Sequence, residues 1–163
     1  MGQSRFRRRS KAALVLTALV LAIPAEASTE KLDYVRKDVQ RHGPDDFVWG
    51  GLARNRDELR VLWDRYNQTG KLPTIRFQKN VAVLGGTGGS SSCPARLHDL
   101  RLNRERKRIV MRVYQTDPGP GFACTDDWVP KTFTLAVSRD DLKPLRASQL
   151  RVRPRRIQDP DPG

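Results

Sequence analysis

The clearest helical pattern in the chain lies between Asn55 and Gly70. Here the apolar side chains recur at the i, i+3, i+4, i+7 spacing that gathers them on one face of an α-helix. They are Leu59, Leu62, Trp63 and Tyr66. Asn55 is a suitable N-cap, Glu58 follows it by three residues as in a capping box, and Gly70 supplies a stop. The opposite face is polar, so we predict one amphipathic helix that packs one side onto a sheet.

After Pro73 the period changes to the two-residue alternation of β-strands. Strands are predicted at residues 74–77, 80–84, 96–102, 108–115 and 132–137. The alternation slips by one register at His98-Asp99, which indicates a β-bulge. The polar residues 103–107 form a hairpin connection. These elements predict an α+β domain over residues 47–145, an antiparallel β-sheet with one main amphipathic helix packed on a face.

The segments on either side of this domain show less order in their pattern. Residues 28–46 are polar and charged, with a short amphipathic turn around Leu32, Val35 and Val39, and we expect a partly ordered lead-in. Near the end of the chain Arg, Pro, Asp and Gly predominate. Such a segment buries too little apolar surface to offset the entropy of ordering it. We therefore predict that residues 146–163 form a basic, disordered tail.

The first 27 residues have the order of a secretory signal peptide. Five basic residues precede an apolar stretch from Ala12 to Ile23, and small residues follow up to Ala27. The alternative is a membrane anchor, but the stretch is shorter than the roughly 20 apolar residues that span a bilayer. We predict cleavage between Ala27 and Ser28, and a product that is secreted or held in the cell envelope.

The chain contains two cysteines, Cys93 and Cys124. In an exported protein an even number of cysteines predicts a disulfide bond. A zinc site is the alternative, but there is no CxxC spacing, and His42 and His98 are the only histidines. The bridge would close a loop of about thirty residues and contribute on the order of 3–4 kcal/mol to stability.

The chain is strongly basic, with a formal net charge of +13. Removal of residues 1–27 lowers it to +9, because five of the 31 basic residues and one of the 18 acidic residues lie there. This charge favours an anionic partner, such as an envelope polymer, a membrane surface or an acidic protein. Basic residues cluster around the hairpin, namely Arg101, Arg104, Arg106, Lys107, Arg108 and Arg112, and further arginines follow in the predicted tail at 146, 151, 153, 155 and 156. No aromatic platform accompanies them, so no nucleic-acid motif is recognised.

Residues 85–92, GGTGGSSS, are the most conspicuous local feature. Glycine-rich loops can hold a phosphate, which makes Gly88, Gly89, Ser90 and Ser91, with the hairpin cations, candidate contacts for a partner or an anion. No Lys follows as in a Walker pattern, so we expect a mobile or tightly turning connection here.

The sequence presents no recognisable catalytic or metal-binding set. The serines lack the G-x-S-x-G elbow. His98 and Asp99 are neighbours on a predicted strand, so their side chains point to opposite faces. Asp126-Asp127 lacks the further oxygen ligands of a calcium loop. We expect a non-enzymatic protein without a cofactor or a metal.

A helix, a strand that ends at Gly85-Gly86, a Thr87-Gly88-Gly89 turn and a proline-led strand at Pro130–Val137 follow one another in the chain. In this order the segment from about Phe47 to Leu142 resembles the C-terminal domain of PrcB, the accessory subunit of a secreted protease complex. The surroundings of the two cysteines depart from that family and look more like disulfide-bridged bacterial exported proteins. The resemblance implies a protein-binding module that assists or restrains an extracytoplasmic protease. Binding of an anionic envelope polymer through the hairpin and tail arginines is the alternative.

Overall fold

Two β-sheets and one α-helix make up the computed structural model, which describes residues 29–44, 48–117 and 119–158. The predicted signal peptide and its cleavage site, residues 1–28, lie outside the described residues. Among the residues that are described, no helix has the length and apolar character needed to cross a membrane.

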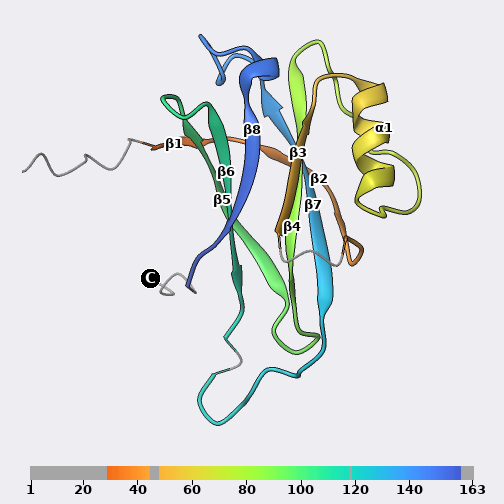
Figure 1. Cartoon of the computed structure of the whole chain (residues 1–163), viewed down its shortest axis with the longest axis vertical. Coiled ribbons are helices and arrows are strands. Elements are labelled where there is room, and N and C mark those ends of the chain that lie inside the picture. Colours follow the sequence, from red (N-terminus) through yellow and green to blue (C-terminus); the bar gives the residue numbers. More distant parts are fainter. Residues whose placement is uncertain (1–28, 45–47, 118, 159–163) are drawn as a thin grey trace, which may run out of the picture.

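The first sheet has the strand order β1-β5-β6-β8, and the second sheet has the order β2-β7-β4-β3 (Figure 1). The strands of the first sheet are β1 (Thr29–Leu32), β5 (Ala95–Asn103), β6 (Arg108–Gln115) and β8 (Arg151–Arg156). Those of the second sheet are β2 (Val35–Gln40), β7 (Val129–Ser138), β4 (Asn80–Gly89) and β3 (Val48–Ala53). All paired strands are antiparallel except β6 and β8, which are parallel.

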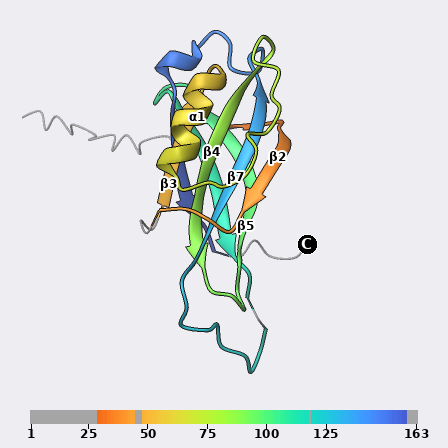
Figure 2. The ribbon, with the colours of Figure 1, turned by 90° about the vertical axis from the view of Figure 1, so that its right-hand side faces the viewer.

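The two sheets pack face to face, and α1 (Arg56–Arg65) covers the outer face of the second sheet (Figures 1 and 2). Successive side chains of β4 point to opposite faces of the sheet and so belong to two different hydrophobic cores. Val81 and Val83 point into the core between the sheets, whereas Ala82 and Leu84 belong to the core under α1. The predicted α+β class with one helix and one disulfide is therefore confirmed. The prediction of a single antiparallel sheet is wrong, because the strands form two sheets and the β6–β8 pair is parallel.

Local chemistry explains where α1 begins and ends. The Asn55 side-chain oxygen accepts a hydrogen bond from the Glu58 backbone N–H at 2.8 Å, which confirms the predicted N-cap. The helix ends at Arg65, five residues before the predicted stop at Gly70. Asn67 already has a left-handed φ of 52°, which a helix cannot continue through.

Three segments differ from their predicted state. Residues 74–77 are not a strand. The lead-in, predicted to be partly ordered with a short amphipathic turn, forms β1 and β2 instead. The predicted disordered tail contains a 3₁₀ turn (Ala147–Gln149) and the strand β8. Each of these strands gains its backbone hydrogen bonds from a partner distant in sequence. The described fold thus begins before residue 47 and continues beyond residue 145.

The glycine-rich segment is also a strand rather than a loop, because β4 continues to Gly89 in register with β7. A Cβ atom at Gly86 would lie 2.0 Å from the Lys131 carbonyl oxygen, and one at Gly88 would lie 2.2 Å from the Trp128 ring. These glycines therefore permit close packing, and they do not form the phosphate cradle considered above.

Cys93 and Cys124 form a disulfide bond, as predicted. It ties the end of the β4–β5 connection to the loop between β6 and β7. Next to it, the Ser91 backbone N–H donates to the Asp127 carboxylate at 3.1 Å. This loop extends beyond the ends of both sheets in Figure 1, and the two ties fix its base.

Candidate anion-binding face

The outer face of the first sheet is built from the outward positions of three adjacent strands. Their apolar alternates, such as Leu100, Met111 and Val152, point into the sandwich or pack against its core. The strand register therefore places nine outward residues in three rows. They are Asp99, Arg101 and Asn103 on β5, Arg112, Val110 and Arg108 on β6, and Arg155, Arg153 and Arg151 on β8. We call these nine residues the arginine grid.

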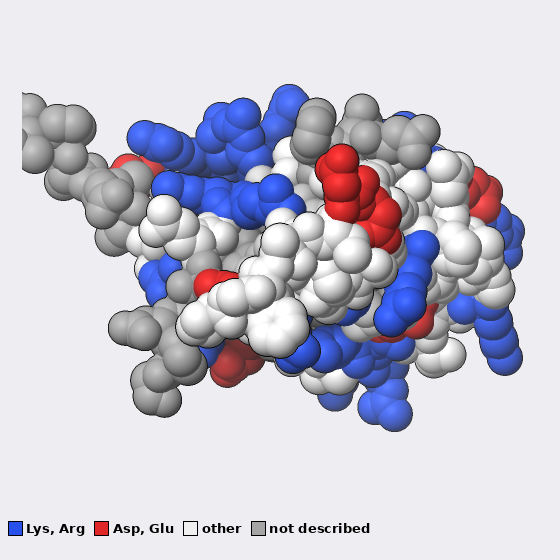
Figure 3. Space-filling model, turned by 90° about the horizontal axis from the view of Figure 1, so that it is seen from below, with Lys and Arg blue, Asp and Glu red and all other residues white. Residues whose placement is uncertain are grey.

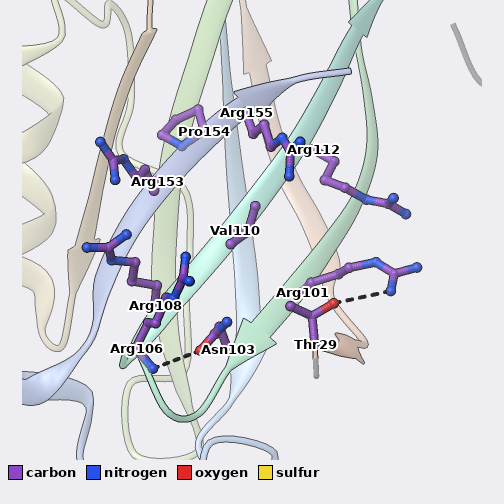
Figure 4. A pocket seen from close by; sticks show the side chains of 10 residues that line it. All are labelled: Thr29, Arg101, Asn103, Arg106, Arg108, Val110, Arg112, Arg153, Pro154 and Arg155. Carbon is purple, nitrogen blue, oxygen red and sulfur yellow. Dashed lines mark hydrogen bonds between the residues drawn. The ribbon is translucent and has the colours of Figure 1, made fainter. Parts of the chain in front are cut away.

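A hollow of about 800 Å³ lies over this face (Figure 4). It is lined by Thr29, Arg106, Pro154 and all of the grid except Asp99 and Arg151. Figure 4 shows Val110 in the middle of the hollow, with arginine side chains from β5, β6 and β8 around it. The short apolar side chain of Val110 thus forms the floor of the hollow, and the side chains around it are long and cationic.

Positive charge on the grid is only partly neutralised. The grid holds six arginines and one carboxylate. Within the described part of the chain, Arg108, Arg151, Arg153 and Arg155 form no ion pair. Neighbouring strands lie about 4.8 Å apart and alternate residues of one strand about 6.7 Å apart, so these cations stand close together. Arg108 lies directly opposite Arg151, and like charges in such cross-strand pairs are destabilising.

A view from one end of the sandwich shows the same imbalance on the surface. Lys and Arg side chains gather at the upper left and lower right of Figure 3, whereas Asp and Glu side chains are fewer and more scattered.

Asp99 is the one carboxylate of the grid, and its side chain is only 5% exposed. Its two oxygens accept hydrogen bonds from Arg112, with Nε to Oδ1 at 2.5 Å, and Oδ2 also accepts from Arg101 Nε at 3.2 Å. Burial acts to raise the pKa of Asp99, but the hydrogen bonds and charges of Arg112 and Arg101 outweigh it and hold the pKa below its ordinary value. The carboxylate therefore stays ionised and anchors two of the six arginines.

A β-bulge puts Asp99 in this position. The register between β5 and β6 shifts between Leu97 and Asp99, which confirms the predicted slip at His98-Asp99. His98 lies instead beside Tyr114, with ring centroids 6.3 Å apart. His98 and Asp99, although adjacent in sequence, thus contact different side chains.

The candidate residues of the hairpin divide into two groups. Arg106 and Arg108 line the hollow. Arg104 does not, because its guanidinium binds the Glu30 carboxylate at 2.8 Å and backbone carbonyls of the β7–β8 connection. Lys107 occupies the turn with a positive φ of 49°.

The candidate residues of the glycine-serine segment lie elsewhere, and none of them lines the hollow. Gly88 and Gly89 belong to β4 and pair with β7. Ser90 is buried, and the Ser91 hydroxyl is 3.1 Å from that of Thr125. Together with Asp127, these side chains hold the base of the disulfide loop.

Arg101 and Arg112 contribute to the grid from β5 and β6, and Arg151, Arg153 and Arg155 contribute from β8. The sequence analysis named the last three as possible polymer contacts but placed them in a disordered tail, so it missed the strand that brings them beside β6. The signal for β8 was the alternation of arginine with Val152 and Pro154. Proline is tolerated here because β8 is an edge strand.

No set of three or more His, Cys, Asp or Glu side chains that could hold a metal occurs within the residues described. Comparison of the chain with protein-family models, with curated proteins and with solved structures gave no match. The resemblance to the PrcB C-terminal domain therefore stays a prediction.

Proposed function

We propose that this protein is an exported, non-enzymatic binding protein that holds an anionic polymer or surface against the arginine grid. The observation that carries the proposal is a set of four arginines, Arg108, Arg151, Arg153 and Arg155, held side by side on one open sheet face. None of them forms an ion pair with another residue that the structure describes. The disulfide is compatible with an extracytoplasmic site of action.

Electrostatics supports this function over a merely solvated surface. Flexible surface cations can turn away from one another, but a β-strand fixes the spacing of its side-chain bases. The grid therefore carries a repulsion that an anionic ligand relieves. An array of such cations also attracts polyanions at long range and releases their counterions on binding, so affinity should fall steeply with salt.

Binding assays with two variants of equal net charge test the proposal. The first variant is Arg108→Gln/Arg153→Gln/Arg155→Gln. The control is Arg56→Gln/Arg60→Gln/Arg65→Gln, which removes three exposed cations from α1. Retention on heparin and the Kd for polyphosphate are measured at several salt concentrations.

We expect the grid variant to lose about tenfold or more in affinity. The slope of log K against log salt should fall in magnitude by about 2–3, as for three lost phosphate contacts. The α1 control should stay within about threefold of the wild type. Equal losses in both variants would show that net charge alone governs binding, and would overturn the proposal.

The protein-partner function implied by the PrcB resemblance is a second proposal, and one observation favours it. Phe122 is 76% exposed at the disulfide-tied loop, where an aromatic side chain is typical of an interface anchor. A photo-crosslinker at position 122 should capture one stoichiometric protein from the native host, whereas one at Val61, 58% exposed on α1, should not. Capture from neither position, or equally from both, would contradict this function.

A further inference from the structure

We infer that the centre of the arginine grid, above Val110, is a seat for one tetrahedral oxyanion, so that polymers bearing phosphate or sulfate groups bind in preference to polymers bearing carboxylates. This inference rests on the proposed function and names the chemical class of its ligand.

The register surrounds Val110 with cations on every side. Arg101 lies opposite it on β5 and Arg153 lies opposite it on β8. Along its own strand Arg108 and Arg112 are two residues away on either side, so their side chains leave the same face. Valine is the shortest side chain of this cross, so the bases of the arginine side chains surround a lower centre. In Figure 4 the Arg101, Arg112 and Arg153 side chains extend outward from Val110.

The carboxylate of Asp99 binds two of the six arginines of the grid, Arg112 and Arg101. A carboxylate is planar and has two oxygens, and those of Asp99 are bound by Arg112 and Arg101 from two neighbouring positions. Figure 4 shows these two arginine side chains extending toward the β5 side of the face. Arg108, Arg153 and Arg155 also line the hollow, and none of the three forms an ion pair with a carboxylate of the described residues.

A tetrahedral oxyanion is suited to the arginines that do not bind Asp99. Its oxygens diverge in three dimensions, so it accepts hydrogen bonds from donors on opposite sides at once. Guanidinium groups supply such donors in a planar fork that matches two oxygens of a phosphate or sulfate. Donors from two parallel strands, about 4.8 Å apart, can therefore converge on one group over the apolar floor.

Val110→Glu is the variant that tests the seat. Its carboxylate would stand among the arginines as an internal anion, so we expect the melting temperature to stay equal or rise while the seat is filled. The matched control is Val61→Glu, which makes the same charge change on the exposed face of α1. Val110→Gln serves as the neutral variant of similar shape.

The probes are polyphosphate, dextran sulfate, polyglutamate of matched charge, and vesicles containing phosphatidylglycerol. We expect polyphosphate or dextran sulfate to bind the wild type at least tenfold more tightly than polyglutamate. Val110→Glu should weaken that binding at least tenfold. Val110→Gln fills the seat without a charge and should weaken binding less than Val110→Glu, while Val61→Glu should stay within about threefold of the wild type. Among polyphosphate, dextran sulfate and vesicles, the tightest binder identifies the source of the oxyanion.

Two results separate the failure of this inference from failure of the proposed function. If polyglutamate binds as well as polyphosphate, or Val110→Glu binds like Val61→Glu, while the grid variant still loses binding, the seat is wrong and the anion-binding function stands. If the wild type binds none of the probes, both are wrong.

Discussion

Asp99 and Arg112 lie opposite each other in register across β5 and β6, and both carboxylate oxygens accept hydrogen bonds from the one guanidinium. The pair neutralises one corner of the arginine grid and leaves the β8 side positive. The same face thus contains an ion pair that stabilises the fold and a group of cations that is open to a ligand.

Replacement of Asp99 should separate these two roles. Asp99→Asn leaves Arg112 and Arg101 without their anion, so we expect a loss of on the order of 1–3 kcal/mol in the free energy of unfolding. The same change adds one net positive charge to the grid, so polyphosphate should bind more tightly. Urea denaturation and a titration measure the two effects. Asp64→Asn, at an exposed position of α1, should change neither by much. Unchanged stability together with weaker binding would contradict the assignment.

The stability provided by Asp99 should depend on pH in one direction. Its pKa is lowered in the folded protein, so the unfolded chain binds the proton more readily. The contribution is present above the ordinary carboxyl pKa of about 4 and is lost as the pH falls through the folded value. The difference in melting temperature between wild type and Asp99→Asn should therefore be large at pH 7 and shrink toward pH 3. A difference that grows on acidification would be inconsistent with this ion pair.

The glycines of β4 should differ in their tolerance of a methyl group. At Gly86 the new Cβ would meet the Lys131 carbonyl oxygen at 2.0 Å, so backbone must move. At Gly85 its nearest neighbour is the flexible Met111 side chain at 3.1 Å, with the Trp49 carbonyl at the same distance. We expect Gly86→Ala to lose about 3 kcal/mol or more, or not to fold, and Gly85→Ala to lose about 1–2 kcal/mol. Thermal melts followed by circular dichroism give the order, and equal losses would rule out the close approach at Gly86.

Loss of the disulfide should destabilise the fold substantially. Cys93 and Cys124 are 31 residues apart, and a loop of that length corresponds to about 3–4 kcal/mol in the chain-entropy model. We expect Cys93→Ala/Cys124→Ala to lose this amount in chemical denaturation. Binding to the grid should persist in the fraction that remains folded, because neither cysteine lines the hollow. A loss below about 1 kcal/mol would mean that the Ser91–Asp127 tie already fixes the loop.

Sequence reasoning succeeded where short-range chemistry decides the structure. The N-cap at Asn55 and the bulge at His98-Asp99 could both be predicted from a few neighbouring residues. The strand β8 could not, because its hydrogen bonds come from β6, about forty residues earlier in the chain. Taken alone, the sequence Arg-Val-Arg-Pro-Arg is typical of a solvated tail. In the fold, Val152 packs against the core between the sheets and Pro154 is buried. The glycines of residues 85–89 likewise look like a loop, because their close neighbours belong to other strands.

The candidate site could likewise be predicted only where neighbouring residues in the sequence determine it. The hairpin sequence pointed to Arg106 and Arg108, which line the hollow. It also pointed to Arg104, but Glu30 of β1 binds that guanidinium. The other arginines of the grid are brought together only by the register of β5, β6 and β8, which no local pattern encodes.

The most direct test of the account is a titration with polyphosphate followed by NMR of the arginine side-chain Nε–Hε groups. We expect the resonances of Arg108, Arg153 and Arg155 to shift and saturate together, while those of Arg56, Arg60 and Arg65 on α1 stay in place. Shifts that centre on α1, or that spread equally over all exposed arginines, would contradict a binding site on the outer face of the first sheet.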